Sequence, residues 1–113
     1  MIDPQLFKVE ADRSGSHLTL YVEGEIDALA APDLIDAYGR HNTPTADAVW
    51  VDLSAVSFLD SSGLLALHRM HQWTTQGGGS FKLIEPSPTV ERILQLTGLD
   101  SVIPAYRTQS ADA

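Results

Sequence analysis

The residues with the clearest capacity for chemistry are four in a row: Asp60, Ser61, Ser62 and Gly63. They separate an apolar segment from an amphipathic one, so they are expected at the start of a helix. The first backbone N–H groups of a helix lack partners within it, and the helix dipole places partial positive charge there. A hydroxyl at that position can therefore carry a phosphate without disrupting the helix. The alternative is structural, since Asp and Ser are also preferred helix-capping residues.

Carboxylates accompany the two serines. Glu25, Asp27 and Asp60 are expected at the C-terminal ends of strands or in the loops just after them. Open α/β sheets present their binding residues at that edge. Each carboxylate could instead make a turn or cap a helix. As a cluster beside Ser61 and Ser62, they are predicted to form a recognition surface.

Catalytic and metal chemistry have less support. A hydrolytic serine needs a base, but His68 lies about two helical turns from Ser61, and the sequence has no GxSxG motif. The glycines at 77–79 lack the surrounding GxxxxGK[ST] pattern of a phosphate loop, which argues against a nucleotide-binding enzyme. His68 and His71 share a helix face without a third ligand, which favours a solvated polar face. We therefore expect no enzyme activity, catalytic residue, metal or cofactor.

Composition restricts the class of partner and the compartment. The chain of 113 residues is predicted to be a single domain, and its hydrophobic content of 43% is that of an ordinary globular protein. A formal net charge of −8 argues against a nucleic-acid partner, which would require clustered Lys and Arg. The N-terminus does not resemble a signal peptide, and the apolar runs are too short to span a membrane. The chain has no cysteine, which fits a reducing compartment. We therefore expect a cytoplasmic protein, and the short apolar runs predict that it has no membrane partner.

Apolar periodicity predicts the elements that position these residues. An alternating pattern with a period of two indicates strands, and a period near 3.6 indicates helices. The predicted strands are 6–11, 17–24, 48–53, 80–85 and 102–106. The predicted helices are 29–41, 62–76 and 88–97, the last with Ser87 as its cap. This order predicts an α/β fold with an antiparallel edge strand, a mixed sheet and helices mainly on one face.

Side-chain patterns also assign faces. In the 62–76 helix, the predicted buried stripe consists of Ala66, Leu67, Met70 and Trp73. Leu65 falls on the opposite side with His68, Arg69 and Gln72. Tyr21 and Trp50 occupy the polar sides of their strands, so both are expected on the sheet face away from the main helix layer. A polar hairpin loop is predicted at 12–16, and a short loop is predicted between 53 and 60.

The segment VDLSAVSFLDSSGLLAL, residues 51–67, resembles the signature of STAS-domain anti-sigma factor antagonists. Further motifs match that family in order and spacing: Gly24-Glu25-Ile26-Asp27 with Ala31-Pro32, Gly77-Gly78, Ser87-Pro88 and Leu96-Thr97-Gly98-Leu99. The resemblance covers roughly residues 6–105 and leaves 106–113 as a flexible tail. It implies a single STAS-like domain with a four- or five-stranded mixed sheet and helices mainly on one face.

The resemblance also implies a function. The unphosphorylated antagonist would bind an anti-sigma factor that is also a serine kinase, and so release a sigma factor. Phosphorylation at Ser61 would switch this binding off, and a metal-dependent serine phosphatase would reverse it. The implied partner-binding residues are Glu25, Asp27, Asp60, Ser61, Ser62, Gly63, Leu65, His68 and Arg69. Leu65 departs from the family pattern, which often has a small residue there. The alternative is a structural subunit of a lipid-transport ATPase or of a stress-sensing assembly.

Overall fold

The computed structural model describes residues 6–107, which form a five-stranded sheet and its covering helices. The strands are β1 (Lys8–Ser14), β2 (His17–Ile26), β3 (Ala48–Leu59), β4 (Ser80–Ile84) and β5 (Ala105–Tyr106). The helices are α1 (Ala30–His41), α2 (Ser61–Gln76) and α3 (Pro88–Thr97), followed by a short 3-10 helix, η1 (Leu99–Ser101). The predicted α/β class and element order are confirmed. Of the predicted tail, Tyr106 belongs to β5, and 108–113 lie outside the described residues.

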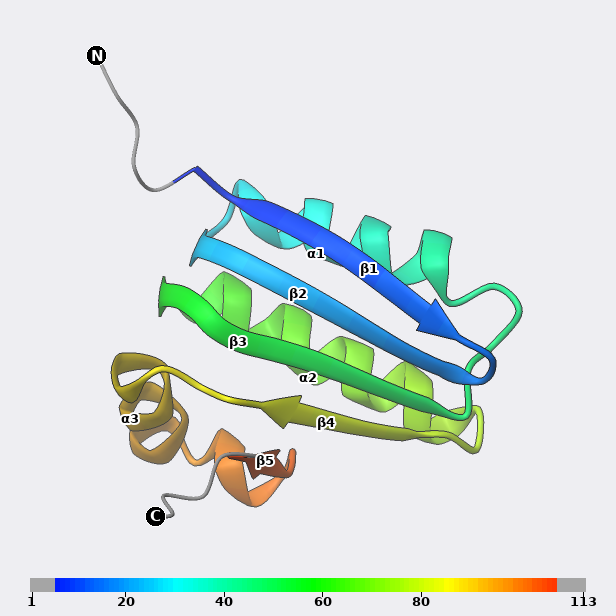
Figure 1. Ribbon diagram of the computed structural model, residues 1–113. Coiled ribbons are helices and arrows are strands. Elements are labelled where there is room, and N and C mark those ends of the chain that lie inside the picture. The colour runs from blue at the N-terminus through cyan, green and yellow to red at the C-terminus, as the bar shows by residue number, and fades with distance from the viewer. Residues whose placement is uncertain (1–5, 108–113) are drawn as a thin grey trace.

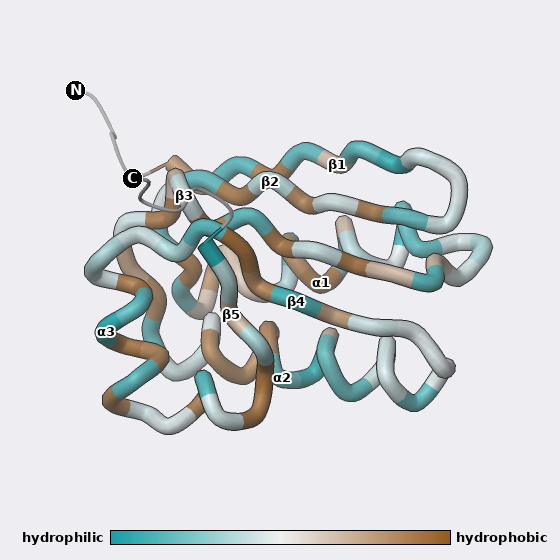
Figure 2. The backbone as a smooth tube through the Cα atoms, turned by 60° about the horizontal axis from the view of Figure 1, so that its bottom comes forward, coloured by the Kyte–Doolittle hydropathy of each residue, from teal (hydrophilic) through white to brown (hydrophobic). Residues whose placement is uncertain are grey.

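The strands lie in the sheet in their order along the chain, from β1 to β5. β1 pairs antiparallel with β2, and the remaining neighbours pair in parallel. The antiparallel edge strand and the mixed sheet are thus confirmed. Figure 1 shows α1 and α2 side by side behind one face of the sheet, and Figure 2 shows the helices beneath the strands. Because β2 and β3 are parallel, α1 and α2 both begin at the same edge of the sheet.

The core lies between the sheet and this helix layer. Alternate residues of the two central strands face it and are almost completely buried: Leu18, Leu20 and Val22 from β2, and Val49, Val51 and Leu53 from β3. The helices contribute Leu34 from α1 and Leu67 and Met70 from α2. These two central strands therefore hold α1 and α2 in a fixed position relative to each other.

The opposite face of the sheet carries the polar and aromatic residues of the same strands. Tyr21 is 45% exposed and Trp50 is half-buried, as predicted for the face away from the helices. The Trp50 ring meets the His17 ring edge-on at 4.4 Å between centroids. The Lys82 ammonium group lies 5.9 Å from the Trp50 centroid and 5.1 Å from that of Tyr106.

The first hairpin is tighter than the polar 12–16 segment suggests. Asp12, Arg13 and Ser14 belong to β1, so the predicted end of this strand at residue 11 is wrong. The guanidinium of Arg13 donates hydrogen bonds to the carbonyl oxygens of Gly15, His41 and Pro44, at 2.9, 3.0 and 2.6 Å. An exposed edge strand can carry polar residues, and here they tie the hairpin to the loop after α1.

The central strands are longer than predicted, and this extension leads directly to the candidate site. β2 continues past Gly24 to Ile26, and β3 continues past Leu53 to Leu59, so the predicted loop before residue 60 is wrong. Register shifts between β2 and β3 interrupt the strict alternation in this part. As a result Val56 and Leu59, three residues apart, are both buried. A register shift of this kind breaks the alternation of buried and exposed residues, so the sequence pattern no longer indicates a strand.

One assignment in α2 is also wrong. Ala66, Leu67 and Met70 are buried as predicted, but Trp73 is 45% exposed and stacks on Tyr38 of α1 at 6.0 Å between ring centroids. The next residue, Thr74, is buried instead. Its hydroxyl forms a 2.7 Å hydrogen bond with the Tyr38 hydroxyl, which satisfies a polar group that would otherwise be costly to bury.

Candidate functional site

The start of α2 is capped by Asp60, and this leaves the neighbouring Ser61 free. The Asp60 carboxylate accepts hydrogen bonds from the backbone N–H groups of Ser62 and Gly63, at 2.8 and 3.2 Å. Ser61 is exposed as the first residue of the helix. Among the described residues, its hydroxyl has no hydrogen-bond partner. The capping interpretation is therefore correct for Asp60, whereas the Ser61 hydroxyl remains available for modification.

Gly63 determines how closely this helix start approaches the sheet. A Cβ atom at Gly63 would lie 2.4 Å from the Ile26 carbonyl oxygen and 3.0 Å from the Cβ atoms of Ile26 and Leu59. The backbone N–H of Asp60 also donates to that carbonyl, at 3.3 Å. Gly63 is therefore buried between α2 and the ends of β2 and β3, and it positions Ser61 rather than contacting solvent.

Asp27 organises the start of α1 in a similar way. Its carboxylate accepts hydrogen bonds from the backbone N–H groups of Leu29 and Ala30, at 3.1 and 3.0 Å. The turn-making interpretation thus holds for Asp27 as well as for Asp60. Both carboxylates remain half-exposed, so their negative charge is still presented at this edge of the sheet.

A shallow acidic hollow lies beside the start of α1. Glu25 and Asp27, which the sequence predicted to act together, both line it. Asp33, an exposed residue in the first turn of α1, lines it too and was not predicted. The hollow has a volume of about 270 Å³. The hollow therefore concentrates negative charge close to the start of α1. Within the part of the chain that the structure describes, its carboxylates do not form a group that could hold a metal ion.

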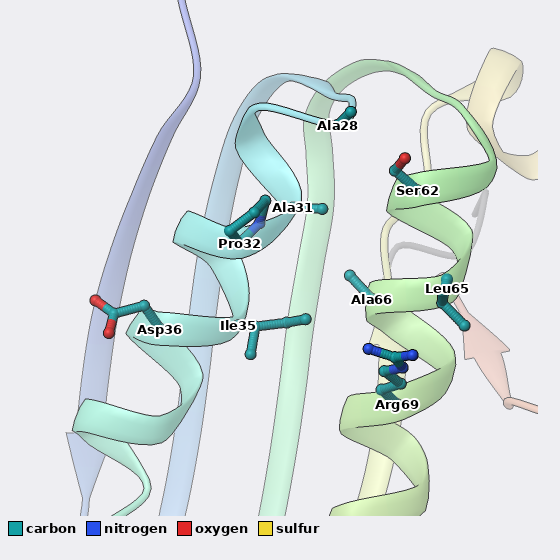
Figure 3. Close-up of a pocket in the computed structure, with 9 residues that line it drawn as sticks. All are labelled: Ala28, Ala31, Pro32, Ile35, Asp36, Ser62, Leu65, Ala66 and Arg69. Atoms are coloured by element: carbon teal, nitrogen blue, oxygen red, sulfur yellow. The ribbon is translucent and has the colours of Figure 1, made fainter.

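A second and larger concavity, the α1–α2 groove, lies between the two helices (Figure 3). Its volume is about 540 Å³. Three of the predicted partner-binding residues line it from α2, namely Ser62, Leu65 and Arg69. The facing wall is formed by α1, with Ala31, Pro32 and Ile35. Because Ser62 follows Ser61, one end of the groove adjoins the candidate phosphorylation site.

Exposed apolar side chains also lie near the starts of α1 and α2. Leu65 is 47% exposed, as expected from its position outside the buried stripe. Leu29 and Phe58 are 85% and 44% exposed, and sequence analysis missed both. They stand at the ends of elements, where no periodic neighbours reveal their orientation. The only sequence signal was their position: Leu29 lies two residues after Asp27, and Phe58 lies two residues before Asp60.

The two histidines of α2 do not lie on a solvated polar face, so that prediction is wrong. His68 and His71 are half-buried, and the His71 ring meets Phe81 of β4 edge-on at 5.9 Å. Burial, and then the nearby His68, lower the pKa of His71. The Nδ1 atom of His68 is buried and has no partner among the described residues. His68 lines neither the acidic hollow nor the larger concavity, unlike its neighbour Arg69.

Across residues 6–107, His, Asp and Glu side chains nowhere gather in a group of three or more that could hold a metal ion. Every helix in that part of the chain is too short or too polar to cross a membrane. What the site offers is an exposed hydroxyl at a helix start, flanked by carboxylates and apolar side chains. Exposed apolar side chains with a polar surround are typical of surfaces that bind other proteins.

Comparisons with known proteins identify the family of the fold. The family model described as STAS domain matches residues 8–111. The chain is 33% identical over 98 residues to an anti-sigma-F factor antagonist of Mycobacterium tuberculosis, spanning 87% of this chain and 79% of the relative. It is 29% identical over 92 residues to the anti-sigma-B factor antagonist of Listeria monocytogenes, spanning 81% of each. A crystal structure of an anti-sigma factor antagonist from Mycobacterium paratuberculosis superposes with a TM-score of 0.82 at 31% identity, covering 99% of this chain and 94% of the other.

Proposed function

The chain belongs to the STAS domain family, and on that basis we propose that it is an anti-sigma factor antagonist controlled by phosphorylation of Ser61. Unphosphorylated, it binds an anti-sigma factor that is also a serine kinase, which then releases its sigma factor. A serine phosphatase acting on phospho-Ser61 restores binding. The observation that carries this proposal is the exposed Ser61 hydroxyl, left free because Asp60 caps the helix.

The geometry favours Ser61 over Ser62 as the phosphoacceptor. Ser61 is exposed, so its hydroxyl can enter the active site of another protein. Ser62 is half-buried, lines the α1–α2 groove and donates its backbone N–H to Asp60. Phosphoryl transfer requires the attacking oxygen to align with the leaving group of ATP. An exposed first-turn hydroxyl meets that requirement without rearrangement of the helix.

A phosphate on Ser61 would change binding much more than folding. It adds roughly 1.5 to 2 negative charges at pH 7. The helix dipole favours such a charge by about 0.3–1 kcal/mol. The Ser62 and Gly63 N–H groups are already bonded to Asp60, however, so the phosphate stays in solvent beside a carboxylate. Because Ser61 is exposed and contributes nothing to the core, the domain is expected to remain folded.

The effect on the interface is expected to be larger. A kinase that uses ATP brings nucleotide phosphates to the Ser61 hydroxyl, so a phosphate already attached there repels them and occupies their position. Juxtaposing like charges in an interface costs several kcal/mol, whereas a tenfold loss of affinity needs only about 1.4 kcal/mol. Phosphorylation can therefore separate the two proteins while each keeps its structure.

The surface around Ser61 has the composition of a partner-binding site. Leu29, Phe58 and Leu65 provide exposed apolar anchors, which a partner can bury to gain affinity. The acidic hollow with Glu25 and Asp33 would be matched by basic side chains on the partner. In this scheme the chain is a substrate and a ligand rather than an enzyme, acting as a single domain in the cytoplasm with the sigma factor it controls.

Phosphorylation by the purified cognate kinase tests the proposal. With ATP, the protein is expected to gain one phosphate, which peptide mapping should locate at Ser61. Ser61→Ala should bind the kinase without being modified, and the matched control Ser62→Ala should still be modified. Labelling of Ser62 alone, or no labelling of the wild-type protein, would contradict the assignment. Recovery of transporter subunits in a pull-down, with no ATP-binding kinase among them, would favour the structural-subunit alternative.

A further inference from the structure

The α1–α2 groove extends away from Ser61 farther than phosphorylation requires. Ser62 lies at the end next to the phosphoacceptor, and Arg69 lies farther along α2 (Figure 3). Arg69 is the eighth residue after Ser61, which corresponds to about 12 Å along a helix axis. Between these ends, Ile35 of α1 and Ala66 of α2 point toward each other across the groove. The groove is therefore an apolar trough about two helical turns long.

Its charges are arranged asymmetrically. Two of the lining residues, Asp36 and Arg69, are charged. The Asp36 carboxylate points away from α2 and is bound to Arg40 at 2.9 Å. Arg69 is exposed, and within residues 6–107 no carboxylate lies close enough to form an ion pair with it. In a chain with 15 acidic and 7 basic residues, the groove thus ends at an unpaired cation.

We propose that the α1–α2 groove receives a short amphipathic helix of the anti-sigma partner, with a carboxylate of that helix on Arg69. This inference rests on the proposed function and extends the interface from Ser61 onto α1. The length and apolar lining of the groove match about two turns of helix, which would place apolar side chains between Leu65 and Ile35. The groove is open along its length, which suits a segment of protein better than an enclosed small molecule.

Charge complementarity determines the chemistry of the occupant. The acidic hollow at one end of the surface, lined by Glu25 and Asp33, selects basic groups of the partner. Arg69, about 12 Å along α2 from Ser61, selects an acidic one. A partner with both must dock in one orientation, because reversal would place like charges together at each end. Arg69 would thereby fix the alignment that brings the kinase active site to Ser61.

Charge reversal with a matched control tests this inference. Arg69→Glu is compared with Arg92→Glu, which makes the same change at an exposed position on α3. The probe is the purified anti-sigma factor kinase, titrated against each unphosphorylated variant. We expect Arg69→Glu to weaken binding at least tenfold and Arg92→Glu to change it less than threefold. A scan that replaces the surface carboxylates of the kinase with Lys, one at a time, should contain one variant that restores binding to Arg69→Glu.

Methyl NMR gives an independent measurement on the wild-type protein. The Ile35 methyl signals should shift when the kinase is added, whereas those of Ile93 on α3, also half-buried, should not. Kinase binding with an unshifted Ile35, or equal effects of the two arginine variants, would overturn the groove proposal and leave the proposed function intact. Failure of the wild-type protein to bind any such kinase would overturn both.

Other occupants of the groove would give different results. Ile35 shifts that depend only on the protein's own concentration would indicate a second copy in the groove. A co-purifying ligand in native mass spectrometry would indicate a small molecule. Either result would contradict the proposal.

Discussion

Two helices of this domain have a serine at their start, Ser61 as the first residue of α2 and Ser87 as the cap of α3, but the two hydroxyls have opposite roles. At the start of α3, the Ser87 hydroxyl accepts the Val90 N–H at 3.3 Å and donates to the Val56 carbonyl at 2.7 Å. At the start of α2, Asp60 performs the capping, and the Ser61 hydroxyl has no partner among the described residues. Ser87 therefore stabilises the fold, whereas Ser61 can be modified without loss of a structural bond.

The comparison shows that the residue type alone does not identify a phosphoacceptor. What matters is whether another side chain satisfies the helix N–H groups first. In α2, an aspartate immediately before the serine does so, and Gly63 lets this capped turn approach the sheet. The substitutions below disturb these features in turn, beginning with the largest expected effect.

Replacing Gly63 with alanine should destabilise the domain most. The added Cβ would lie 2.4 Å from the Ile26 carbonyl oxygen, so α2 must shift away from β2. Overpacking of this kind costs typically 1–3 kcal/mol, and we expect about 3 because the obstructing atom is backbone. Gly39→Ala, in α1 with open space around it, is the control and should gain about 0.5–1 kcal/mol. Urea denaturation of the two variants measures both values, and equal stability would contradict the account of Gly63.

The two serines themselves provide the next test. Ser87→Ala removes a helix cap and a bond to β3, so it should cost about 1–2 kcal/mol of unfolding free energy. Ser61→Ala removes no hydrogen bond of the described residues, so it should stay within about 0.5 kcal/mol of wild type. Thermal melts of both variants under the same conditions decide this. If Ser61→Ala lost as much stability as Ser87→Ala, Ser61 would be a structural residue.

Leu65 extends the comparison from hydroxyls to apolar side chains. It is 47% exposed, and Leu96 on α3 is 74% exposed. Leu65→Ala should weaken kinase binding by more than about 1 kcal/mol, because Leu65 is an anchor beside Ser61. Its stability cost should be well below the roughly 2–5 kcal/mol of a truncated core leucine. Leu96→Ala is the control and should leave binding unchanged. A large loss of stability with unaltered affinity would assign Leu65 to the core.

Much of the fold could be predicted because its signals are local. The alternation of Leu18, Leu20 and Val22 marks β2, and the Ser87-Pro88 pair marks the start of α3. Gly98, with a φ of 79°, ends that helix in the left-handed conformation that favours glycine. In each case, a few adjacent residues are enough to determine the local backbone conformation.

The errors arose where distant residues decide the structure. The ends of β2 and β3 depend on register shifts between the two strands, which no single segment reveals. The polar residues Asp12 to Ser14 form a strand only because β2 pairs with them. In the site, Ser61 could be identified from its neighbours, whereas Leu29, Phe58 and the α1 wall of the groove needed the folded chain. Residues that line a concavity from two helices have no shared pattern in the sequence.

The most direct test of the central claim is to measure the affinity of the cognate kinase for the phosphorylated and unphosphorylated protein, with a thermal melt of each form. We predict that phosphorylation of Ser61 weakens binding by roughly a hundredfold or more, corresponding to about 2.8 kcal/mol, while the melting temperature stays near that of the unmodified protein. Equal affinity of the two forms would contradict the account. Loss of binding together with unfolding would also contradict it, because the free Ser61 hydroxyl would then be part of the fold rather than a switch on its surface.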